Sequence, residues 1–130
     1  MSIPKHPLMV LVAGPYRSGT GDNPALVAHN MQAINEAALA VFRAGHLPVA
    51  GAWFALPLIE TTGSARIGDA AWDAIFHPVA ERIAARCDAC LRIGGASVGA
   101  DAMVAIFKRG SRPVFHHPGD LPPAPAGAAA

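Results

Sequence analysis

Two glycine-rich segments carry the groups best suited to bind a ligand. The first, residues 14–21, reads Gly-Pro-Tyr-Arg-Ser-Gly-Thr-Gly and follows an apolar run at residues 8–13. Arg17 suits a phosphate or a carboxylate because its donors form a planar fork, and Gly14 and Ser18 add a backbone amide and a hydroxyl. The segment lacks the Gly-Lys-Ser/Thr of a Walker loop and the early helix of a dinucleotide fingerprint. An anion-binding loop and a solvated surface turn therefore both remain open.

The second segment, residues 94–100, reads Gly-Gly-Ala-Ser-Val-Gly-Ala. Its small residues, including Gly95 and Gly99, let a ligand approach the backbone closely. The helix expected after it presents free amides and the positive end of its dipole, and both favour an anion. Ser97 can cap that helix, bind a phosphate oxygen, or do both.

Two cysteines, Cys87 and Cys90, form a lone C-x-x-C pattern. Cys87 is expected at the C-terminal end of a helix, where the dipole opposes a thiolate. One pair also supplies too few ligands for a structural zinc site. Buried structural cysteines are the prediction, with a redox or metal role as the alternative. Neither a metal nor a cofactor is predicted.

Hydrophobic periodicity predicts the elements that hold these segments. Four short apolar runs indicate strands, at residues 8–13, 46–50, 89–93 and 113–116. Asn23 and Pro24 are suited to begin a helix that Gly45 ends. A further helix is expected from Ser97 to Arg109.

The middle of the chain reads differently because two prolines interrupt its apolar pattern. Pro57 is expected to break a short helix over residues 53–59, and residues 60–68 are expected to form a mobile loop. Pro78 is expected to end a helix that starts at Asp69, with a new helix after it.

Strands that alternate with helices predict an α/β fold. We expect a small doubly wound parallel sheet of four to five strands, Rossmann-like or flavodoxin-like, flanked by helices. The usual strand orders place the first and third strands side by side, and ligands bind beyond their carboxyl ends. Both glycine-rich segments are therefore expected to meet there. Residues 1–117 are expected to form this domain, and residues 118–130, rich in proline and alanine, are expected to be a disordered tail.

The composition excludes several classes of protein. The chain has 130 residues, 52% hydrophobic and 15% charged, with a formal net charge of +1. This composition argues against a disordered chain, and the balanced charge argues against nucleic acid polymers and anionic membranes as partners. No apolar run approaches the roughly 20 residues of a membrane helix. The apolar start is short enough to be a buried strand rather than a signal peptide, so a cytoplasmic protein is expected.

Four short motifs resemble the nucleoside 2-deoxyribosyltransferase-like superfamily, and within it the nucleoside 5'-monophosphate N-glycosidases. They are Ala-Gly-Pro-Tyr at residues 13–16, Ala-Gly-His at 44–46, Cys-Asp-Ala at 87–89 and Ser-Val-Gly-Ala at 97–100. The resemblance covers about residues 7–116. It implies a doubly wound domain that cleaves an N-glycosidic bond of a small nucleoside or nucleotide. It also implies a homodimer or a higher homo-oligomer.

The same resemblance implies a mechanism in which a glutamate attacks the anomeric carbon to form a covalent sugar intermediate. That glutamate would lie six residues after Ser97, where this sequence has Met103. Cleavage would therefore need a displaced carboxylate, either Asp101 or Glu81, with Tyr16 orienting it. Glu81 stands where the family has a helical aspartate. Asp101 lies about 200° around the helix from Met103.

The resemblance also implies that the two glycine-rich segments hold the phosphate. The residues concerned are Gly14, Arg17, Ser18, Gly95, Ser97 and Gly99. The sequence thus predicts nucleoside or nucleotide binding, with cleavage of a nucleoside 5'-monophosphate if a displaced carboxylate serves. A non-catalytic nucleotide or anion sensor of the same fold is the alternative, because Met103 can neither attack nor ionise.

Overall fold

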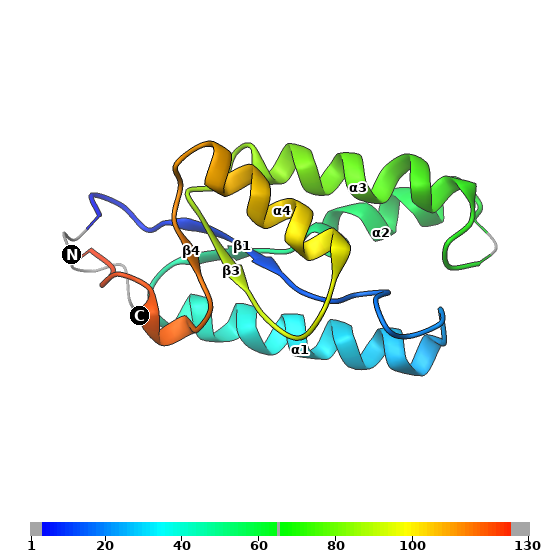
Figure 1. Ribbon diagram of the computed structural model, residues 1–130, viewed down its shortest axis with the longest axis horizontal. Helices are drawn as coiled ribbons and strands as arrows, with labels where there is room; N and C mark the ends of the chain where they lie inside the picture. The colour runs from blue at the N-terminus through cyan, green and yellow to red at the C-terminus, as the bar shows by residue number, and fades with distance from the viewer. Residues whose placement is uncertain (1–3, 65, 126–130) are drawn as a thin grey trace.

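A four-stranded parallel sheet runs through the centre of the computed structural model, which describes residues 4–64 and 66–125 (Figure 1). Its strands are β1 (Met9–Ala13), β2 (Leu47–Val49), β3 (Ala89–Arg92) and β4 (Val114–Phe115), in the order β2-β1-β3-β4. Every neighbouring pair is parallel. The predicted α/β doubly wound class is confirmed, and the first and third strands lie side by side.

Helices cover both faces of this sheet. They are α1 (Pro24–Arg43), α2 (Gly51–Thr61), α3 (Ala70–Ala84) and α4 (Val98–Arg109), followed by a short 3-10 helix, η1 (Pro118–Asp120). In Figure 1, α1 lies on one side of the sheet and α3 and α4 lie on the other, with α2 packed beside α3. None of the helices in the described part of the chain is long and apolar enough to cross a membrane.

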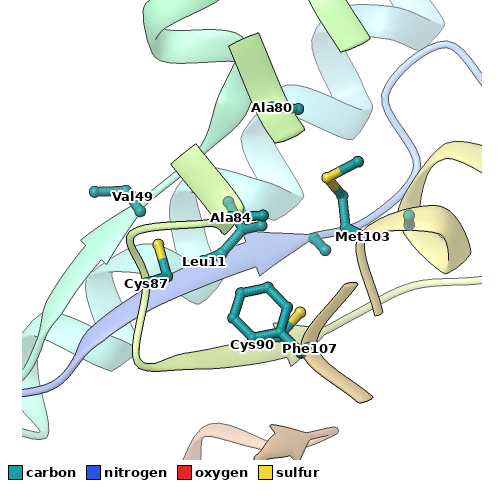
Figure 2. Packing of buried hydrophobic residues seen from close by; sticks show 10 residues of the cluster. Leu11, Val49, Ala80, Ala84, Cys87, Cys90, Met103 and Phe107 are labelled. Atoms are coloured by element: carbon teal, nitrogen blue, oxygen red, sulfur yellow. The ribbon is translucent and has the colours of Figure 1, made fainter. Parts of the chain in front are cut away.

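The alternation of side chains along β1 explains why this strand is apolar throughout. Val10 and Val12 pack against the buried face of α1. Leu11 and Ala13 point to the other face, where they pack against α3 and α4 with Met103 (Figure 2). Because both faces are covered, no position on the strand can be polar.

The predicted helix break at Pro78 is wrong, and the break at Pro57 is wrong as well. Both α2 and α3 continue through their prolines. A proline inside a helix costs about 3 kcal/mol because it removes one hydrogen bond and crowds the preceding turn. The two helices nevertheless pack their buried faces together on both sides of the prolines, with Ile59 of α2 near Trp72 of α3. This packing outweighs the local cost and shortens the predicted loop.

The segment after residue 117 also differs from the expected disordered tail. Residues 118–120 form η1, and Leu121 packs against the core on the α1 side. The buried imidazole of His46 joins this segment to the sheet: its Nδ1 accepts from the Leu8 amide at 3.0 Å, and its Nε2 lies 2.7 Å from the Pro122 carbonyl oxygen. The chain is therefore packed as far as Pro122, and residues 126–130 of the predicted tail lie outside the described residues.

Candidate functional site

A cavity of about 170 Å³ lies beyond the carboxyl end of β1, between the sheet and the α3 and α4 helices. This is where ligands bind in doubly wound sheets. Much of its lining comes from three segments: Gly14, Tyr16, Arg17 and Ser18 from the first loop, Trp72, Asp73, Phe76 and His77 from α3, and Ser97, Gly99 and Met103 around the start of α4.

The two glycine-rich segments meet at this cavity as predicted. The Ser18 hydroxyl donates to the Ser97 hydroxyl oxygen at 3.1 Å. Ser97 is 7% exposed, and the same oxygen accepts from the Ala100 amide at 3.1 Å. Ser97 is therefore the N-cap of α4, and it also forms part of the cavity wall, so capping does not remove it from reach of a ligand.

Glycine is needed where the loops approach each other. A Cβ atom on Gly14 would lie 2.7 Å from Cγ1 of Ile93, at the end of β3. Gly94 has a φ of +75°, and a Cβ atom there would lie 2.7 Å from Cδ of Pro15. Glycine at both positions therefore allows the loop after β1 to pack closely against the loop after β3.

Arg17 lines the cavity but is already paired. Its Nε and Nη2 donate to the two carboxylate oxygens of Asp22 at 2.8 and 3.0 Å. Its guanidinium carbon lies 5.6 Å from the centre of the Trp72 ring. The hydrogen bond from Arg17 lowers the pKa of Asp22, so Asp22 is a carboxylate at neutral pH. A phosphate must therefore compete with Asp22 for this guanidinium.

Three aromatic rings form one wall of the cavity. Tyr16, Trp72 and Phe76 have ring centres 5.5–5.9 Å apart and planes inclined by only 11–16°. Burial raises the pKa of the Tyr16 phenol, which stays protonated near neutral pH. The sequence analysis did not find this wall, although aromatic residues at positions 72 and 76 have the spacing that puts two rings on one helix face.

Neither carboxylate predicted to replace the family glutamate lies in the cavity. Met103 lines it, and two positions earlier Asp101 points away, with its side chain 70% exposed and its Oδ1 3.2 Å from Nε of Arg92. Glu81 is exposed on α3 and does not line the cavity. Gly95 does not line it either, and its carbonyl accepts from Arg92 at 2.8 Å.

The structure brings a different acid into the cavity, together with a histidine. All nine carboxylates and all six histidines lie in the described ranges, and Asp73 and His77 are the members of each set that line the cavity. They are four residues apart on α3, so they share one face of the helix. That spacing was visible in the sequence, but nothing local showed that this face of α3 turns toward the first loop.

Both cysteines are buried in the core between β3, α3 and α4 (Figure 2). Burial raises the pKa of Cys87 to about 11 and, with the neighbouring Cys87 adding to it, that of Cys90 to about 12. Within residues 4–64 and 66–125, no group of three histidine, cysteine or acidic side chains is placed to hold a metal ion. The predicted structural role therefore fits the environment of both thiols.

We expect both thiols to react slowly with an aromatic disulfide reagent at pH 8, on the order of a hundredfold slower than free cysteine, because little thiolate is present. In denaturant both should react at once, and Cys90→Ala should halve that signal. The folded protein keeps both thiols protonated to a higher pH than the unfolded chain does. The stability that the buried thiols contribute is therefore fully present below about pH 9 and is lost as the pH rises toward 11–12. Native labelling within tenfold of the denatured rate would contradict this assignment.

No protein-family model matches this sequence, and no curated protein or solved structure matches it. The likeness to the deoxyribosyltransferase-like superfamily therefore rests on the four motifs, and it stays a prediction.

Proposed function

We propose that the cavity binds a nucleoside 5'-monophosphate. The observation that carries this proposal is the pairing of an aromatic wall with hydroxyls and a helix N-terminus inside one small cavity. A nucleotide has the same two halves, an aromatic base and an anion. The four motifs that resemble the nucleotide N-glycosidases add support from the sequence.

The aromatic wall suits the base. Stacking of a base on an aromatic side chain contributes about 1–3 kcal/mol and tolerates any base, because every base has a π face. Tyr16 is half-buried and comes from the loop, whereas Trp72 and Phe76 are fixed on α3. The wall therefore presents a largely rigid surface with one ring that the first loop carries.

The lining around the start of α4 suits the phosphate. Ser18 and Ser97 place two hydroxyls within 3.1 Å of each other at the start of α4. The first amides of a helix have no partner within the helix, and the positive end of the dipole favours an anion. Gly99 lines this end without a side chain, so a phosphate can approach the backbone.

Binding without cleavage is the form of this function that the geometry favours. Where the resemblance implies a nucleophilic glutamate, the buried Met103 lines the cavity. The two replacement carboxylates considered from the sequence, Asp101 and Glu81, lie outside it. A nucleotide sensor is thus better supported than an N-glycosidase, and chromatography of a long incubation with nucleotide should show no free base.

Two further expectations belong to this proposal. The first is a cytoplasmic location, because free nucleoside monophosphates are available there. A homo-oligomer is supported by three apolar side chains of α2, Trp53, Phe54 and Leu58, which are 38–51% exposed. Large exposed apolar groups that gather on one helix are typical of a surface that binds another protein.

Calorimetric titration with nucleoside monophosphates, nucleosides and ribose 5-phosphate tests the proposal. We expect measurable binding of the monophosphates, and Tyr16→Leu should weaken it roughly tenfold because one stacking surface is lost. The same variant should leave the binding of ribose 5-phosphate unchanged. Phe42→Leu is the matched control, because Phe42 is an exposed aromatic residue on α1 and lies outside the cavity. Absence of binding by every monophosphate would overturn the proposed function.

A further inference from the structure

We propose that the cavity prefers a nucleotide whose phosphate carries a single negative charge, as a phosphodiester does, and that the Asp73 carboxylate sets this preference by repelling a doubly charged phosphate. This inference rests on the proposed function, because it names the charge of the nucleotide that the same cavity takes. The resemblance assigns no role to Asp73.

The charged side chains at the cavity carry no surplus positive charge. Within residues 4–64 and 66–125, Arg17 is the one lysine or arginine that lines the cavity, and Asp73 is the one acid. Arg17 already donates from Nε and Nη2 to Asp22, so its charge is matched by that carboxylate. Asp73 takes part in none of the side-chain hydrogen bonds or ion pairs found in the same ranges. One negative charge is therefore left over.

Asp73 lies close to the guanidinium that is expected to bind the phosphate. The guanidinium carbon of Arg17 lies 5.6 Å from the ring centre of Trp72, the residue before Asp73 in α3. The hydrogen bond to Asp22 is the main cause of the raised pKa of Arg17, and the charge of Asp73 adds to it. A phosphate bound to Arg17 would therefore lie within electrostatic reach of a second carboxylate.

His77 is the cavity residue whose type titrates near neutral pH. It lies one turn after Asp73 on α3, and its ring meets the edge of Phe76 with ring centres 6.1 Å apart. A neutral imidazole leaves the charge balance unchanged, whereas a protonated one adds a positive charge, so the test has to separate His77 from Asp73. Several charged residues of the neighbouring segments do not line the cavity: Glu60, Arg66, Asp69 and Asp101.

This charge balance favours a singly charged phosphate over a doubly charged one. The start of α4 contributes about half a positive charge, and Ser18 and Ser97 contribute neutral hydroxyls. A phosphate dianion would therefore leave water with little compensation of its second charge. A phosphodiester carries one charge near neutral pH. A nucleoside 5'-monophosphate carries nearly two at pH 8, because its second pKa is about 6.

Calorimetric titration at pH 8 with three adenosine ligands tests the inference: the 5'-monophosphate, its 5'-O-methyl ester and the cyclic 3',5'-monophosphate. We expect the wild type to bind both diesters roughly threefold to fivefold more tightly than the monophosphate. The factor is modest because Asp73 is exposed and water screens its charge. Asp73→Asn should tighten the monophosphate by about the same factor and bring the ratio close to one. A purely structural role for Asp73 would instead weaken all three ligands together.

A second titration at pH 6 separates the phosphate from His77. The monophosphate gains a proton there, so it should bind more tightly than at pH 8, and this gain should persist in His77→Gln. The methyl ester does not titrate in this range, so its affinity for His77→Gln should stay constant. Loss of the monophosphate gain in His77→Gln would assign the pH dependence to the imidazole and overturn the inference.

The matched control is Glu81→Gln, which removes one negative charge from an exposed position of α3 outside the cavity. It should leave the diester-to-monophosphate ratio as in the wild type. A wild-type ratio near one, a ratio that Asp73→Asn does not change, or tight binding of the cyclic diester alone would overturn the inference while nucleotide binding stands. If the monophosphate binds at neither pH, the proposed function itself has failed.

Discussion

Replacing Phe107 with alanine is expected to lower the free energy of unfolding by about 3–5 kcal/mol. Phe107 is the largest side chain of the described chain that is fully buried, at 0% exposure, and it lies between α4 and the sheet (Figure 2). The guanidinium of Arg112 covers its ring at 4.4 Å and donates from Nη1 to the carbonyl oxygens of Ala84 and Cys87, both at 2.6 Å. Truncation would leave a cavity and remove the surface on which Arg112 rests.

Urea denaturation followed by circular dichroism measures this loss. The matched control is Phe42→Ala on α1, because Phe42 is 59% exposed and its truncation should change stability by no more than about 0.5 kcal/mol. Since small domains are stable by only about 5–15 kcal/mol, the Phe107 variant should lose a large part of its stability. A change below about 1 kcal/mol would show that the core between α4 and the sheet is not packed as described.

The second large effect concerns substitutions of Arg17 and of Asp22, which should change the affinity for the phosphate in opposite directions. Arg17→Ala is expected to weaken nucleoside monophosphates roughly tenfold or more, because a charge-assisted hydrogen bond to the phosphate is lost. Asp22→Asn should strengthen them a few-fold, because the guanidinium no longer has to leave a carboxylate. The gain is small because both side chains are more than a third exposed, so water screens their ion pair.

Asp22→Asn is a mild change for the backbone as well. Asp22 has a φ of +60°, a conformation that asparagine adopts readily. Titration of a monophosphate and of its nucleoside at two salt concentrations separates the phosphate effect, because only the phosphorylated ligand should respond to either variant. Equal weakening by both substitutions would show that the pair builds the loop and that Arg17 does not reach the ligand.

Local signals in the sequence predicted much of the fold correctly. Asn23 caps α1 by accepting from the Ala25 amide at 2.9 Å, and Ser97 caps α4. The continuous apolar run ending at Ala13 is a strand buried on both faces, and the two glycine-rich segments meet at the cavity. Caps, apolar periodicity and the handedness of strand–helix–strand units depend on residues close together in the chain or on rules common to all sheets.

Other features depended on contacts between distant segments. The helix through Pro78 persists because α2 packs along α3. The segment after β4 is held where the Pro122 carbonyl meets the imidazole of His46, 76 positions earlier. No short pattern in the sequence contains these partners.

The sequence by itself thus determined the α/β doubly wound class and the site beyond the first strand where the two glycine-rich segments meet, and it has Met103 where the resemblance implies a glutamate. Only the tertiary structure decided which polar groups face that site: it placed Asp101 and Glu81 outside and brought Asp73 and His77 in. The physical reason is that helical periodicity fixes which residues share a face. The rotation of each helix against the sheet, set by packing of the whole core, decides which face the cavity meets.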